Sequence, residues 1–416
     1  MKRVLVAVAL FTACRGDHAK SHATTGSAGV ASIVPKLYKS EDGVEELRAL
    51  DKRIEIHRDV PVQEIGLLLL RATYRGHVED YQAADRLSAE WVARDNTLAA
   101  WDTRTRALTA IHDFSAARDA LAHVKKLALG DDQWAELATA IDEAGGRRDR
   151  SFPARSEGAK RWPSAANLTV YAGALALEGH FDEAIELIPK AAKAVNDNSP
   201  ETFAWLLFQW GRLYEQKGDF ASARAFYQAA HERIPGYVEA NAHLALTMIS
   251  TGDTDGAKRV VAEALKTDRQ PSLLELAAQL GIGSVASPAL PGETAPPNGG
   301  AVSIAEARAE WERYVTTLPK AFADHAARFY LGVGKNPQRA LELARLNLAN
   351  RDVPEARELV IQAALAANDT ATACEVAGPL IDAALRAHRF AAWRAFSQCG
   401  RTDEANRLAK DLGITP

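Results

Sequence analysis

Residues 203–235 read FAWLLFQWGRLYEQKGDFASARAFYQAAHERIP, and this stretch decides the fold. Gly211 and Ala223 place very small side chains where two antiparallel helices can approach each other closely. Gly218 can adopt a positive φ and end the first helix, and Pro235 stops the second helix. The stretch therefore predicts a helical hairpin.

A short element of this hairpin recurs along the chain: an aromatic residue, Thr or Pro, then two residues, then Ala. It reads Tyr81–Ala84, Phe114–Ala117, Phe181–Ala184, Phe220–Ala223, Thr254–Ala257, Pro337–Ala340, Thr370–Ala373 and Thr402–Ala405. Glycines stand two residues before the element at Gly179, Gly218, Gly252 and Gly400, where the preceding helix would end. The pattern resembles the tetratricopeptide repeat, whose period is about 34 residues.

This resemblance covers roughly residues 62–410 and implies an all-α fold, a solenoid of helical hairpins wound into a right-handed superhelix. A segment rich in proline and glycine at 284–302 excludes a helix there. It predicts two sub-arrays, 41–283 and 303–416, and leaves open whether they form one continuous superhelix. We expect a degenerate repeat near 131–150 and a break in the array at 151–156.

The amino terminus is typical of an export signal. Lys2 and Arg3 precede a ten-residue apolar run, Val4–Ala13, which is too short to span a membrane as a helix. The end of this run, with Cys14, resembles a bacterial lipobox, so we expect a signal peptide at 1–13, a lipidated Cys14 and a flexible tether at 14–40. The resemblance implies a lipid anchor in the cell envelope that faces the periplasm, in the outer membrane rather than the inner. A plain signal peptide with an incidental Cys14 is the alternative.

Composition and motifs argue against several function classes. The formal net charge of −4, with 25% charged residues, argues against a nucleic-acid surface. We find no zinc-protease, phosphate-loop or nucleophile-elbow motif, and expect no enzyme activity, no cofactor and no metal site. Asp324 and His325 are neighbours in sequence, and on a helix they would point about 100° apart, so they do not predict an acid–base pair.

The best-matching repeat also carries the candidate partner-binding residues. By resemblance, Trp205, Phe208, Arg212 and Glu215 lie on the helix face that lines the concave groove of the solenoid. Exposed aromatic residues and arginine often dominate the energy of protein interfaces. The alternative is that a neighbouring repeat covers the two aromatic rings.

Cys374 and Cys399 are a candidate disulfide, because the repeat register places the start of one second helix beside the end of the next first helix. Two buried free thiols are the alternative.

Together these features predict a scaffold or adaptor at the bacterial cell envelope that binds a partner protein or peptide of unknown identity. We keep two alternatives: an enzyme with an active site in 303–416, and a structural repeat protein without a lipid.

Overall fold

The computed structural model describes residues 41–414 except 132–133, 197–198 and 283–301. The predicted signal peptide, Cys14 and the tether lie outside this part of the chain, as does nearly all of the predicted 284–302 linker. The described residues form α-helices and one short 3₁₀ helix, η2 (Gly378–Leu380), and they contain no β-strand. The fold is the predicted all-α helical solenoid.

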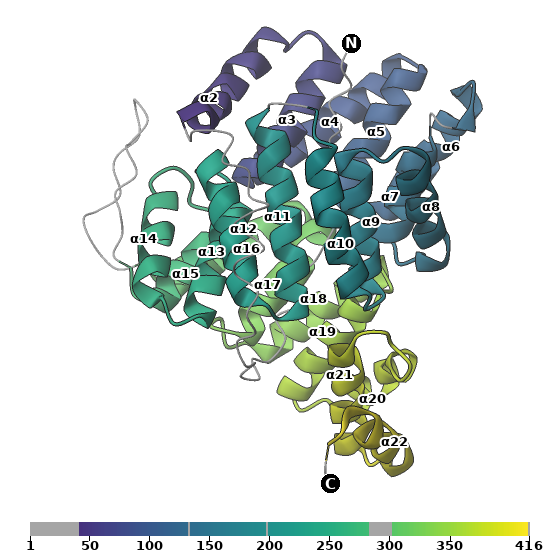
Figure 1. Ribbon diagram of the computed structural model, residues 1–416, viewed down its shortest axis with the longest axis vertical. Helices are drawn as coiled ribbons and strands as arrows, with labels where there is room; N and C mark the ends of the chain where they lie inside the picture. Colours follow the sequence, from purple (N-terminus) through teal and green to yellow (C-terminus); the bar gives the residue numbers. More distant parts are fainter. Residues whose placement is uncertain (1–40, 132–133, 197–198, 283–301, 415–416) are drawn as a thin grey trace.

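Helix α2 (Glu41–Ile56) precedes a series of antiparallel hairpins (Figure 1). The hairpins are α3 (Pro61–Arg75) with α4 (Val78–Arg94), α5 (Leu98–Ala110) with α6 (Phe114–Leu127), α7 (Ala135–Ala144) with α8 (Arg148–Arg161), α9 (Ala165–Leu177) with α10 (Phe181–Lys193), α11 (Pro200–Lys217) with α12 (Phe220–Arg233), α13 (Val238–Ser250) with α14 (Thr254–Ala264), α15 (Pro271–Leu280) with α16 (Ile304–Thr317), α17 (Pro319–Leu331) with α18 (Pro337–Asn350), α19 (Pro354–Ala366) with α20 (Thr370–Ala377), and α21 (Arg386–Cys399) with α22 (Thr402–Leu412).

The recurring sequence element marks the start of the second helix in most hairpins. Its first residue opens α6, α10, α12, α14, α18, α20 and α22, whereas Tyr81 lies one turn inside α4. The alanine that follows is buried in every case, and Ala223 is fully buried against α11 while its neighbour Ala221 is exposed. A small side chain is needed at this contact because α11 and α12 are closely packed. In the same hairpin, a Cβ atom added at Gly211 of α11 would lie 2.6 Å from the Tyr227 ring of α12.

The turn inside each hairpin requires a left-handed backbone residue. Gly218 has a φ of 84°, and its backbone N–H caps the end of α11. Where glycine is absent, His112 (φ 58°), Lys335 (φ 46°) and Asn368 (φ 60°) take the same conformation. This conformation is unfavourable for residues with a Cβ atom, so hairpin packing holds these three positions in place.

One predicted break is wrong. The segment 151–156 lies inside α8, which continues past Pro153 to Arg161. A proline inside a helix removes one backbone hydrogen bond. Because α8 packs along both α7 and α9, tertiary contacts offset that loss, and the degenerate repeat near 131–150 becomes the α7–α8 hairpin.

The two sub-arrays contact each other along their length. We call α2–α15 the N-terminal sub-array and α16–α22 the C-terminal sub-array. Polar contacts join α16–α19 to the N-terminal sub-array: Arg313 pairs with Glu79, Lys320 with Asp113, Asn350 with the His112 carbonyl, and Glu355 with Arg148. In Figure 1 the light-green helices α16–α19 accordingly lie against the purple-to-teal arc of the N-terminal sub-array. These contacts show that the two sub-arrays pack against each other.

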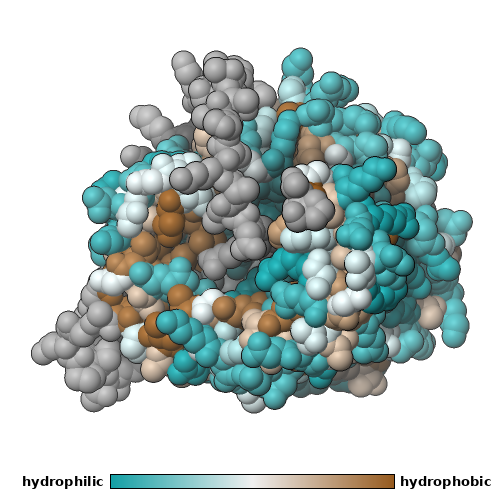
Figure 2. All heavy atoms as spheres, turned by 90° about the horizontal axis from the view of Figure 1, so that it is seen from below, coloured by the Kyte–Doolittle hydropathy of each residue, from teal (hydrophilic) through white to brown (hydrophobic). Residues whose placement is uncertain are grey.

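On the face seen from below, hydrophobic residues gather at the left and along the lower middle of the view, and hydrophilic residues predominate toward the right (Figure 2). The large hydrophobic side chains that are exposed in the described part of the chain are Val44, Ile56, Val60, Val62, Leu129, Trp162, Ile304 and Leu346. No helix among the described residues is long and apolar enough to cross a membrane.

Candidate functional site

A cavity of about 170 Å³ lies between the two sub-arrays. Helices α3, α4, α5, α11, α13 and α15 contribute its N-terminal wall, and α16 and α17 contribute its C-terminal wall. Seven aromatic side chains line it: Tyr81, Trp205, Phe208, Tyr237, Trp311, Tyr314 and Phe322. The cavity is therefore built by residues that lie up to 279 positions apart in the sequence, from Ala72 to Arg351.

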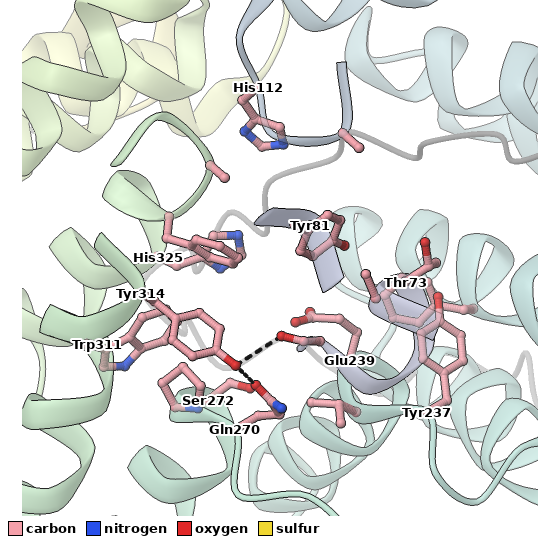
Figure 3. Close-up of a pocket in the computed structure, with 18 of the residues that line it drawn as sticks. Thr73, Tyr81, His112, Tyr237, Glu239, Gln270, Ser272, Trp311, Tyr314 and His325 are labelled. Carbon is pink, nitrogen blue, oxygen red and sulfur yellow. Dashed lines mark hydrogen bonds between the residues drawn. The ribbon is translucent and has the colours of Figure 1, made fainter. Parts of the chain in front are cut away.

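Hydrogen bonds and ring contacts hold the C-terminal wall in place (Figure 3). The Tyr314 hydroxyl lies within hydrogen-bond distance of two acceptors, the carbonyl oxygen of Gly76 at 3.0 Å and the side-chain oxygen of Gln270. The Tyr314 ring meets the Phe322 ring edge-to-face, with centroids 4.9 Å apart. Tyr314 therefore fixes α16 against the N-terminal sub-array at the edge of the cavity.

The structure places three of the predicted partner-binding residues at this cavity. Trp205, Phe208 and Arg212 all line it, from one face of α11. Phe208 is only 5% exposed and Arg212 only 6%. The Phe208 ring packs on Tyr237, with centroids 5.1 Å apart. The expectation of an open groove is corrected for Phe208, because Tyr237 and His243 of the next repeat cover its ring, as the alternative supposed, whereas Trp205 is only partly buried.

Glu215 does not line the cavity. Its carboxylate accepts a hydrogen bond from the Tyr227 hydroxyl at 2.5 Å and lies 2.7 Å from Nδ1 of His243. Burial would raise the pKa of Glu215, but the charge of His243 and these hydrogen bonds lower it to about 2. Glu215 thus joins α11, α12 and α13, and its predicted role in contacting a partner is corrected to one in holding adjacent repeats together.

A buried ionic cluster forms another part of the wall. Arg351, which is 4% exposed, donates to Oδ2 of Asp324 at 2.8 Å. Burial would raise the pKa of Asp324, but the charges of His325 and Arg351 lower it to about 2. Burial and the charge of Arg351 lower the pKa of His112 to about 3. The cluster therefore presents a neutral His112 and a charge-balanced Arg351–Asp324 pair.

His325 lies outside hydrogen-bond reach of its sequence neighbour. Its Nε2 is 3.8 Å from Oδ1 of Asp324, and its ring stacks on Trp311 with centroids 6.1 Å apart. A general base needs a partner within about 2.6–3.2 Å. The arrangement favours a role for His325 in the cavity wall.

The sequence did not identify the C-terminal wall as part of the site. Trp311 and Tyr314 are three residues apart, and that spacing predicts a shared helix face, but nothing in it indicates which helix they oppose. Glu239, at the start of α13, also lines the cavity, and its carboxylate lies among the cavity residues in Figure 3.

Cys374 and Cys399 are joined as a disulfide, with an S–S distance of 2.05 Å. The bond connects α20 with the end of α21, and neither helix lines the cavity. No group of three or more His, Cys, Asp or Glu residues that could hold a metal ion occurs in the described ranges.

Comparisons with known proteins agree with this architecture. Residues 214–280 match a family model described as tetratricopeptide repeat. No curated protein matches the sequence. The fold is similar to that in a crystal structure of the APC/C hetero-tetramer Cut9–Hcn1, at 11% identity and a TM-score of 0.45, covering 92% of this chain and 69% of that chain.

Two further solved structures are similar. One is the human IFIT1 dimer with PPP-AAAA, at 14% identity and a TM-score of 0.42, covering 87% of this chain and 76% of that chain. The other is the C-terminal part of a TPR repeat-containing protein from Cytophaga hutchinsonii, at 13% identity and a TM-score of 0.30, covering 65% of this chain and 90% of that chain. Likeness at this level carries no argument about ligands.

Proposed function

Because this chain is a tetratricopeptide-repeat protein, we propose that it is a protein–protein interaction scaffold that receives part of a partner protein at the cavity between its sub-arrays. The observation that carries this proposal is the ring of seven aromatic side chains around a cavity of about 170 Å³. Aromatic residues dominate the binding energy of many interfaces. The space is suited to one or two side chains of a partner, so the partner's main chain would lie outside the cavity.

Catalysis in the 303–416 segment is the weaker alternative. This segment does contribute His325 and Arg351 to the cavity, and such convergence of titratable groups is what an active site requires. However, Arg351 is bound to Asp324, and His325 stacks on Trp311. The described wall offers no activated nucleophile beside a base.

The scaffold proposal predicts that filling the cavity abolishes partner binding. Ser272 is a small, partly buried wall residue in the first turn of α15. Partners are first captured in cells with a photo-crosslinking residue at Thr73, which also lines the cavity, and are identified by mass spectrometry. We expect Ser272→Trp to weaken binding of the purified partner at least about tenfold, or 1.4 kcal/mol.

The matched control is Gln279→Trp, which adds the same side chain at an exposed position of the same helix. This variant should bind normally, and both variants should keep the melting temperature of the parent protein within a few degrees. Normal binding by a folded Ser272→Trp protein would place the interaction elsewhere. Equal loss of partner binding in both variants would mean that an added indole group, and not the filling of the cavity, causes the effect.

We propose further that the scaffold is anchored by lipid on Cys14 in the cell envelope, in the outer membrane and facing the periplasm. The support for this is the charged and apolar sequence that precedes Cys14. We expect Cys14→Ser to abolish incorporation of labelled fatty acid and to move the protein out of the membrane fraction. If parent and variant fractionate alike and neither is labelled, the non-lipidated alternative is correct.

A further inference from the structure

The cavity contains a carboxylate without a matching cation. Glu239 lies in the first turn of α13, and in Figure 3 its side chain lies between Tyr314, Tyr81 and Tyr237. The side chain is 43% exposed, so a ligand in the cavity could reach it. The nearest basic atom paired with it in the described residues is Nε2 of His243, at 4.0 Å, which is too long for a hydrogen bond.

The two arginines of the wall are engaged by other groups. Arg351 donates to Asp324 at 2.8 Å, so this pair carries no net charge. The guanidinium carbon of Arg212 lies 6.0 Å from the centre of the Phe208 ring, and its charge contributes to lowering the pKa values of Glu215 and Tyr237, so it is shared among several neighbours. Glu239 is therefore the acidic group of the cavity that is not hydrogen-bonded to a basic side chain.

The rings around Glu239 are also suited to a cation. Figure 3 shows the Glu239 side chain beside the rings of Tyr81 and Tyr237. Burial and the negative charge of Glu239 raise the pKa values of both tyrosines, and the charge of Arg212 opposes this rise at Tyr237. Aromatic faces attract ammonium groups, and the attraction increases when the cation is removed from water. A carboxylate among aromatic rings combines the two features that select an alkylammonium group over a neutral or anionic group of the same size.

We propose that the cavity binds an alkylammonium group, supplied by a lysine side chain of the partner protein. This inference rests on the scaffold function proposed above, and it specifies the chemistry of the partner's anchor. The four-carbon chain of lysine would lie against Phe208 and Tyr237, and its ammonium group would pair with Glu239.

The test uses n-butylammonium as a probe for the lysine side chain, with n-butanol as a neutral probe and butyrate as an anionic probe of similar size. Binding to the full-length protein is followed by NMR through the indole N–H signals of Trp205 and Trp311. These signals are assigned with Trp→Phe variants. We expect saturable binding of n-butylammonium, weaker binding of n-butanol and no saturable binding of butyrate. Glu239→Gln should weaken n-butylammonium binding about tenfold.

The control variant is Glu186→Gln, which makes the same change in charge at an exposed position on α10 and should leave binding unchanged. Butyrate binding as tightly as n-butylammonium, or unchanged affinity in a folded Glu239→Gln protein, overturns the inference. Competition between n-butylammonium and the captured partner identifies a partner lysine as the source. Binding without competition identifies a free amine instead and overturns the assignment to a partner lysine. The Ser272→Trp experiment tests the scaffold function separately, because it does not depend on the charge of the ligand.

Discussion

Replacing Glu355 by alanine is expected to lower the free energy of unfolding by about 3–5 kcal/mol, because it removes the buried carboxylate that the partly buried Arg148 and the buried His388 share. Glu355 is 7% exposed and accepts two hydrogen bonds from Arg148, at 2.7 and 2.9 Å. It also lies 3.7 Å from Nε2 of the buried His388. Burial would raise the pKa of Glu355, but His388 and Arg148 hold that pKa far below its ordinary value.

Urea unfolding followed by helical circular dichroism measures this effect. Glu375→Ala, on the exposed side of the neighbouring helix α20, is the control and should change the free energy of unfolding by less than about 0.5 kcal/mol. Because Arg148 belongs to α8 and Glu355 to α19, the loss should also loosen the contact between the two sub-arrays. Similar stabilities for both variants would mean that this ion pair contributes little to the interface.

The repeats could be predicted because each is specified locally. Phe220, Ala223 and Gly218 encode the turn and the helix contact of one hairpin within a few residues, and the same spacing recurs along the chain. The turns at His112, Lys335 and Asn368 gave no glycine signal, although their backbone has the same left-handed conformation. The α8 helix was missed because Pro153 is locally unfavourable and only contacts with α7 and α9 offset its cost.

The cavity was only half predictable, for a different reason. Trp205, Phe208 and Arg212 follow from the repeat register, which defines the concave face of α11. Trp311 and Tyr314 reach the same cavity through the stacking of α16 on α4 and on the turn after α3. That stacking depends on the accumulated twist of all the intervening repeats, so no local pattern encodes it. The burial of the predicted face of α11 follows from the same stacking of repeats.

The charge network at Glu355 also makes the stability depend on pH. His388 is 1% exposed, and its Nδ1 lies 2.6 Å from Oε2 of Glu358. Burial would lower the pKa of His388, but the charges of Glu355 and Glu358 and the hydrogen bond to Glu358 raise it from 6.5 to about 9. The folded protein therefore holds this proton more tightly than the unfolded chain does, so the stabilisation is complete below pH 6.5 and is lost as the pH rises through about 9.

We expect the free energy of unfolding to fall by about 3 kcal/mol between pH 6 and pH 9.5 through His388, since each pKa unit corresponds to about 1.4 kcal/mol. His388→Gln can still donate a hydrogen bond to Glu358 but carries no titrating charge, so it should be less stable than the parent at pH 6 and nearly equal to it at pH 9.5. The difference between the two proteins, measured by urea unfolding at both pH values, removes contributions from other groups that titrate in this range. A difference that stays constant across the range would show that His388 is neutral in the folded protein, and that Arg148 alone balances the two carboxylates.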